Sequence, residues 1–210
     1  MRRTSDSTRY LKMACGENPK NTYGASRGGV LPYSRMGVAW TLRKMLDDAR
    51  SLVTRQNDWC ENPSTTERLP EDVELEQLVE LLRGRMNVHV HCYEVHDMQM
   101  MLRLSDEYQF DIHAFHHALE AWRIPDLLLN RGVTAAIFAD KWGFKLESYD
   151  GTPHAASILH EAGVKVALKT DHPVISAKLL MHQAAIAHSF GLPDYAAIAG
   201  TNKKGIIFNG

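Results

Sequence analysis

The sequence predicts an α/β fold built around a parallel β-sheet with flanking helices. Between residues 86 and 190, short apolar segments alternate with segments of helical periodicity four times in succession. The links between these segments are short, which favours parallel strands joined by right-handed crossovers. The composition is that of a globular protein, since 44% of the 210 residues are hydrophobic and 23% are charged.

The first part of the chain is rich in loops but contains three predicted elements. A short apolar segment at 10–14 predicts a strand. Apolar residues recur at helical spacing over 36–57 and again over 73–82, and Gly84 ends the second of these helices. The segment between the two helices, 58–72, is polar and is expected to be a loop.

Four predicted strand–helix units follow. The clearest strand is 86–92, in which apolar and polar residues alternate. Helix 153–162 begins with a proline and is followed by a glycine, while Pro125 interrupts helix 119–130. The other predicted strands are 110–115, 133–139 and 164–169, and the other predicted helices are 97–108 and 175–190.

Charge and hydropathy exclude several classes of partner. The formal net charge is −1, so no overall field attracts nucleic acid or an anionic membrane. No apolar run approaches the roughly 18 residues of a membrane span, and the two N-terminal arginines precede no apolar stretch of the kind that a secretory signal has. The three cysteines are odd in number and stand in no metal-binding spacing, so we expect no disulfide framework and, by default, a reducing cytoplasmic compartment.

Histidine and carboxylate residues stand at the carboxyl ends of the four regular strands, where parallel α/β folds bind their ligands. None of the eleven histidines falls in the first 88 residues, and six fall between 89 and 117. The strands end at His91, at 116–117, at Asp140 and at 170–172. Imidazoles and a carboxylate from separate strands suit zinc or a similar divalent ion. Such an ion lowers the pKa of its bound water to about 7 and polarises a carbonyl, which is the chemistry of hydrolysis.

The histidine pattern leaves two alternatives open. Polar residues are common at strand ends because loops begin there, so a histidine at such a position is often an ordinary surface residue. His89 and His91 lie two residues apart and share one face of a strand, so that they either form a chelating pair or His89 lies deeper in a polar interior. His113 is expected to be structural, His96 to cap a helix, and His182 and His188 to lie on a helix surface.

On these residues the sequence resembles the amidohydrolase superfamily, in particular the imidazolonepropionase- and prolidase-like branch of metal-dependent hydrolases. The resemblance runs from about residue 9 to about residue 195, and Thr-Asp-His-Pro at 170–173 with its strand is the most specific segment. The matching stretches are 11–20, 34–37, 88–91 with Asp97, 116–117 with 120–122, 139–144, 149–154 and 167–174.

The resemblance implies a partial (β/α)₈ barrel, roughly strands 4 to 8, with one or two divalent metals, most simply zinc, at its carboxyl face. It implies that His91 and His117 are metal ligands on strands 5 and 6. It gives Asp171 two roles, as the metal ligand on strand 8 and as the group that moves the proton of the attacking water. Lys12 resembles the strand-4 lysine that bridges two metals as a carbamate, and His172 would lie beside the metal at the substrate.

The resemblance also sets the expected organisation. We expect residues 1–199 to be a partial amidohydrolase barrel, with a loop-rich part at 1–72 and regular strand–helix units at 73–199, and residues 200–210 to be an irregular tail. Barrel strands 1 to 3, with the His-x-His pair of strand 1, have no counterpart before residue 9. Three ligands then require Asp171 to bind the metal, so we expect weak metal binding and little hydrolysis by the 210 residues alone.

Three functions fit the pattern to different degrees. The first is metal-dependent hydrolysis of a C–N bond in a small amide, cyclic amide or dipeptide-like substrate. The second is a non-catalytic remnant that folds or self-associates through open sheet edges without metal. The third is a doubly wound binding domain of flavodoxin type, which leaves the histidines and aspartates at successive strand ends without a role.

Overall fold

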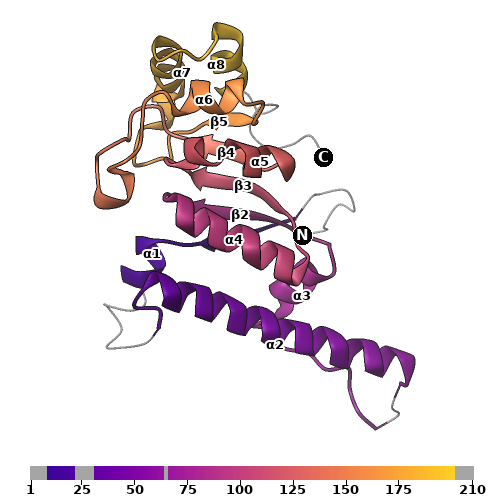
Figure 1. Ribbon diagram of the computed structural model, residues 1–210. Coiled ribbons are helices and arrows are strands. Elements are labelled where there is room, and N and C mark those ends of the chain that lie inside the picture. The colour runs from indigo at the N-terminus through magenta and orange to yellow at the C-terminus, as the bar shows by residue number, and fades with distance from the viewer. Residues whose placement is uncertain (1–8, 22–30, 64–65, 202–210) are drawn as a thin grey trace.

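The structure is a computed structural model that describes residues 9–21, 31–63 and 66–201. These residues form one sheet of five parallel strands in the order β1-β2-β3-β4-β5, with helices packed along it (Figure 1). Each strand after β1 lies beside the strand that precedes it in the chain and is parallel to it. The predicted α/β class with a single parallel sheet is confirmed.

The strands lie close to their predicted positions. The 10–14 strand is found as predicted, while the second regular strand is shifted by two residues and runs as far as His117. The last strand ends one residue before Lys169. The bounds are β1 Tyr10–Ala14, β2 Asn87–Cys92, β3 Ile112–His117, β4 Thr134–Ile137 and β5 Val166–Leu168.

The helices follow the predicted order, with differences at their ends. The Ser34 side chain accepts a hydrogen bond from Gly37 N at 3.1 Å and so caps the longest helix, α2. The helix predicted at 119–130 is broken before Pro125, as expected. The helices are α1 Glu17–Pro19, α2 Arg35–Glu61, α3 Glu76–Leu82, α4 Val95–Tyr108, α5 Pro125–Asn130, α6 Ala155–Glu161, α7 Leu180–Ser189 and α8 Asp194–Thr201, with 3₁₀ turns at Ala121–Arg123, Leu146–Ser148 and Ala177–Leu179.

Two features near the chain ends differ from expectation. Helix α8 was not predicted, and it extends to Thr201, into the segment expected to be an irregular tail. The rest of that segment, 202–210, lies outside the described residues, as do 1–8. Among the residues that the structure describes, no helix is both long and apolar enough to cross a membrane.

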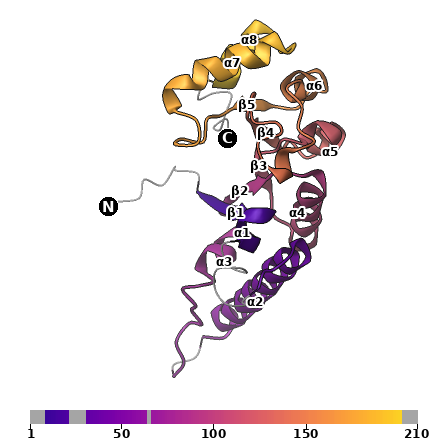
Figure 2. The ribbon, with the colours of Figure 1, turned by 90° about the vertical axis from the view of Figure 1, so that its left-hand side faces the viewer.

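The two faces of the sheet differ in chemistry. Val88, Val90 and Phe115 are fully buried in the apolar core that the strands share with the helices. Figure 2 shows α2, α4, α5 and α6 on one side of the strands. Because side chains alternate along a strand, the residues between the apolar ones, His89 and His91, lie on the opposite face. The positions of His89 and His91 are therefore a consequence of how the apolar face packs.

Cys15 and Cys92 form a disulfide, which corrects the expectation of none. Cys15 directly follows β1 and Cys92 ends β2, and the pairing of Ala14 with His91 brings the two cysteines side by side, with a Cα–Cα distance of 5.3 Å. The cysteines are 77 residues apart in sequence. Cysteine spacing does not reveal that they meet; the adjacency of β1 and β2 does, and only the assignment of these segments to barrel strands 4 and 5 implied it.

Tyr108 joins α4 to α2 and generates a prediction about stability. Its hydroxyl donates to Asp47 Oδ1 at 2.9 Å and approaches Arg43 O at 3.2 Å. Burial, assisted by the bond to Asp47, raises the Tyr108 pKa from 10.0 to about 12. Since the folded pKa is raised, the unfolded chain loses its proton first, and stability falls as the pH rises from 10.0 towards 12.

We expect Tyr108→Phe to lower the free energy of unfolding at pH 7 by about 1 kcal/mol, the worth of one buried hydrogen bond. Because phenylalanine does not ionise, the stability of the variant should also fall less than that of the parent protein above pH 10. Urea unfolding at pH 7 and above pH 10 measures both effects. Tyr149→Phe, at an exposed position, is the matched control. An alkaline loss in Tyr108→Phe as steep as that of the parent protein would contradict the assignment.

Candidate active site

His91 and His117 lie in contact at the carboxyl ends of two neighbouring strands. Their ring centroids are 4.2 Å apart, and both side chains are buried. Burial is the main reason why the pKa of His91 falls to about 4, and burial together with the nearby Lys169 charge lowers the pKa of His117 even further. Both imidazoles are therefore neutral near pH 7, the form in which histidine binds metal ions.

The backbone at these positions is held in an uncommon conformation. His117, Ala118 and Asp171 have φ angles of 72°, 43° and 53°, in the left-handed region that non-glycine residues seldom adopt. Hydrogen bonds from Ala118 N to Cys92 O at 2.8 Å and from Val174 N to Asp171 O at 2.9 Å support the two turns. Such strain costs roughly 1–3 kcal/mol per residue and concentrates at functional sites.

Lys169 stands between His117 and Asp171. Its Nζ lies 3.1 Å from Asp171 Oδ1 and 3.3 Å from His117 Nδ1. Burial lowers the Lys169 pKa to about 8, against the raising effect of Asp171. The structure therefore brings His91 and His117 together directly but connects Asp171 to them through the lysine. Sequence reasoning did not single out Lys169. The available signal was its position, directly after a buried strand and two residues before Asp171.

Lys12 and His172 occupy more exposed positions than the other predicted site residues. Lys12 lies in the middle of β1, paired with His89. Its positive charge contributes to lowering the pKa of both His91 and His117, so Lys12 acts on the same face of the sheet. The exposed His172 accepts a weak hydrogen bond from Ala177 N at 3.4 Å through its Nδ1. Their assignment to a metal and a substrate remains a prediction.

The other histidines of this face form a second cluster. His89 Nδ1 lies 2.8 Å from His116 Nε2, and the His89 ring stacks on His113 with centroids 5.3 Å apart. Burial lowers the pKa of His89 to about 4 and that of His116 to about 3. The contacts of His89 favour the interpretation that it lies deeper in a polar interior over the one in which it chelates metal with His91.

Aromatic rings border the histidine pair. The Tyr93 ring stacks on His117 with centroids 4.7 Å apart and an angle of 4°, and Phe138 lies 5.3 Å from His117. Tyr93 and Phe138 belong to a small apolar cluster with Leu119 and Ile175. Lys145 Nζ lies 3.9 Å from the Tyr93 ring centre, a cation–π contact. These rings keep much of the water away from His117.

Arg35, near the start of α2, links three acidic residues beside the site. It pairs with Glu94 and Asp97 and lies 3.9 Å from Glu147. Glu147, whose side chain is 1% exposed, also accepts a hydrogen bond from Glu17 N at 2.6 Å. Arg35 therefore connects the 140–152 loop to the start of α4, and Glu147 connects the same loop to Glu17 after β1. Sequence reasoning anticipated neither link.

A second group of possible metal ligands lies at the start of α4. Among the described residues, ligand atoms of Glu94, His96 and Asp97 lie within 4.8 Å of one another. Arg35 already neutralises Glu94 and Asp97, and His96 is exposed, with Nε2 3.4 Å from Glu94. We interpret this group as an arginine-centred ion-pair cluster, distinct from the predicted site at His91, His117 and Asp171.

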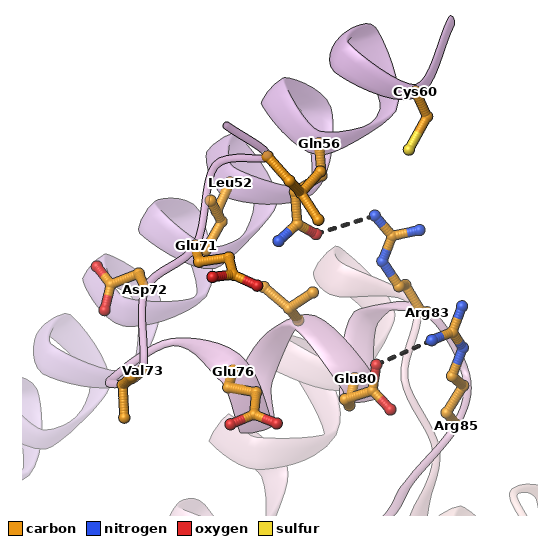
Figure 3. A pocket seen from close by; sticks show the side chains of 12 residues that line it. Leu52, Gln56, Cys60, Glu71, Asp72, Val73, Glu76, Glu80, Arg83 and Arg85 are labelled. Carbon is orange, nitrogen blue, oxygen red and sulfur yellow. Dashed lines mark hydrogen bonds and ion pairs between the residues drawn. The ribbon is translucent and has the colours of Figure 1, made fainter. Parts of the chain in front are cut away.

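A cavity of about 480 Å³ lies between α2 and α3, away from the histidines (Figure 3). Leu52 and Val79 line it together with several acidic side chains. Its arginines are already paired, Arg83 with Gln56 and Arg85 with Glu80. The Arg85 end adjoins the amino end of β2, whereas parallel α/β folds place their chemistry at the carboxyl ends. We therefore place the candidate site at the histidines.

The five parallel strands with helices along them define the class of a partial α/β barrel, and comparisons with known proteins show which family it resembles. No family model matches the chain. A curated protein named Amidohydrolase tasK, from Hapsidospora irregularis, is 41% identical over 201 residues, 91% of this chain and 20% of that protein. The crystal structure of an amidohydrolase from Thermotoga maritima MSB8 matches with a TM-score of 0.87 and 26% identity, over 96% of this chain and 51% of that one.

These similarities confirm the predicted relationship to the amidohydrolase superfamily. The five parallel strands correspond to part of the barrel fold of an amidohydrolase, as the sequence predicted. The chain spans about half the length of the solved structure and a fifth of the curated protein.

The Arg35 cluster predicts that Arg35 has a larger effect on stability than an ordinary surface arginine. Arg35→Met leaves the nearly buried Asp97 without its cation, which should cost at least about 2 kcal/mol of unfolding free energy, while Glu147 keeps its ion pair with Lys145 Nζ at 2.8 Å. Arg43→Met on the same helix removes an exposed pair with Glu107 and should cost at most about 1 kcal/mol. Urea unfolding compares the two variants, and equal losses would refute the role of Arg35.

The histidine pKa values predict acid sensitivity. Because the folded pKa values of His89 and His116 lie below the ordinary 6.5, the unfolded chain binds more protons as the pH falls. The contribution of these two histidines is therefore complete above pH 6.5 and is lost progressively down to about pH 4 for His89 and about pH 3 for His116. We expect the midpoint temperature of thermal unfolding to vary less with pH in the double variant His89→Gln, His116→Gln than in the parent protein. The exposed His182→Gln variant should show the same pH dependence as the parent protein. Identical profiles for all three proteins would exclude this origin of acid sensitivity.

Proposed function

We propose that this chain carries the active-site strands of a metal-dependent amidohydrolase that cleaves a C–N bond with water. The substrate class would be a small amide, cyclic amide or dipeptide-like molecule. The single observation that carries the proposal is the buried pair of neutral imidazoles, His91 and His117, at adjacent carboxyl strand ends. The similarity to proteins that are themselves named amidohydrolases supports the same reaction class.

The donor atoms of the site fit a divalent ion of the zinc type. His91 Nε2 is buried and has no hydrogen-bond partner among the described residues. Buried polar atoms usually have a partner, and a metal ion would supply one. His91 and His117 would hold the ion, and the Asp171 carboxylate would complete a set of two nitrogens and one oxygen. When bound, the ion would acidify a water molecule and polarise the substrate carbonyl.

The residues of the chain itself would handle the proton and the surroundings. Asp171, whose side chain is 38% exposed, is reachable from solvent and would accept a proton from the attacking water and deliver it to the leaving nitrogen. The rings of Tyr93 and Phe138 would shield His117 from bulk water. His172, next to Asp171 and exposed, would contact the substrate.

Metal binding and hydrolysis test the proposal. In the presence of excess Co²⁺, we expect the chain to develop visible absorption from nitrogen-ligated cobalt, and His91→Asn to abolish it. With excess zinc and a panel of N-acyl amino acids and dipeptides, we expect slow amine release by the parent chain, in keeping with its incomplete set of ligands, and Asp171→Asn should lower that release to background. His182→Asn, on the exposed side of α7, is the matched control. Amine release that persists in Asp171→Asn, or cobalt absorption that persists in His91→Asn, would refute the proposal.

A further inference from the structure

The ammonium group of Lys169 occupies the space in which His117 and Asp171 would share a metal ion. Its Nζ lies within hydrogen-bonding distance of both, at 3.3 Å from His117 Nδ1 and 3.1 Å from Asp171 Oδ1. One positive charge thus satisfies two of the three predicted ligands. By contrast, the buried His91 Nε2 has no hydrogen-bond partner among the described residues.

The hydrogen bond to Lys169 fixes the state of the His117 ring. An ammonium group can only donate, so His117 Nδ1 accepts and its hydrogen is on Nε2. A neutral imidazole has a single nitrogen lone pair, and Lys169 already uses it. His117 therefore has no nitrogen free to bind a metal ion while this contact exists.

The Lys169 ammonium has little room to move away. The Lys169 backbone N donates to Ile137 O at 3.0 Å, which continues the pairing of β4 with β5 and fixes the start of the side chain. The side chain is 13% exposed, and Nζ lies 4.9 Å from the centre of the Phe138 ring, a cation–π contact. Its position between His117 and Asp171 is thus held by the sheet, by an aromatic ring and by two hydrogen-bond partners.

We propose that Lys169 is a built-in competitor of the metal, and that a divalent ion binds at His91, His117 and Asp171 only by displacing its ammonium group. This inference rests on the proposed metal site. An incoming ion needs the lone pairs that Lys169 engages, and it is repelled by the lysine charge at close range. The chain then has two alternative states, one closed by Lys169 and one that binds metal.

Zinc affinity of charge-altering variants tests the competition. Lys169→Met removes the ammonium while keeping an apolar stem beside Phe138, and it should bind Zn²⁺ at least about tenfold more tightly than the parent chain. Lys169→Arg keeps the charge and should bind no more tightly than the parent. Lys165→Met removes an exposed cation just before the amino end of β5, the strand that Lys169 follows, and should change affinity less than about threefold, since exposed charges are screened. Competition with a chromophoric chelator measures all four affinities.

A second pair of variants separates this inference from the proposed function. Lys169→Gln removes the charge with a polar side chain and provides a replacement if Lys169→Met does not fold, as judged by circular dichroism. His91→Asn in the Lys169→Met background reports whether the zinc is bound at the proposed site. Tighter binding that His91→Asn abolishes supports both proposals. Equal, His91-dependent binding by parent and Lys169→Met overturns the competition alone, and binding that does not depend on His91 in either protein overturns both.

Discussion

The parallel pairing of β2 with β3 is the constraint on which the candidate site depends. Val88, Val90 and Phe115 bury completely against the helices, so their packing sets the register of the two strands. Because side chains alternate, the same packing directs His89 and His91 to the other face. A slip of one residue would place imidazoles in the apolar core, which explains how ordinary hydrophobic burial determines the position of polar chemistry.

The electrostatics of the site follow from the same burial. Burial and the nearby charges of Lys12 and Lys169 disfavour the protonated form of these histidines, so their pKa values fall. Positive charge within the cluster is therefore carried by the lysines, while the imidazoles remain neutral acceptors. Asp171 provides the balancing negative charge through its pair with Lys169. Within this arrangement the His117 lone pair is engaged by Lys169, whereas the buried His91 Nε2 has no partner among the described residues.

Periodicity predicted the fold well, and strand-end reasoning predicted part of the site. The strand at β1 and the break before Pro125 were both found, because local spacing and proline chemistry control them. The disulfide of Cys15 with Cys92 and the helix α8 were missed. The disulfide depends on the adjacency of two strands that are distant in sequence. Helix α8 begins where the family resemblance ends. His91 and His117 meet as their strand ends suggested. Lys169 was not predicted, because sequence alone does not distinguish a buried lysine at the end of a strand from an exposed one. Its contacts with His117 and Asp171 make the distinction.

The site is thus asymmetric in a way that bears on its chemistry. On one side, the Lys169 ammonium bridges Asp171 and His117 by hydrogen bonds, so each of these three groups has a partner. On the other, His91 holds a buried nitrogen without a partner among the described residues, at a cost of about 1–3 kcal/mol. Any ligand that satisfies His91 lowers this cost, whereas a ligand that also engages His117 must first break the chain at Lys169. Whether a ligand occupies the site therefore depends on two residues of this chain. His91 gains a partner when a ligand binds, and Lys169 loses its hydrogen bonds to His117 and Asp171.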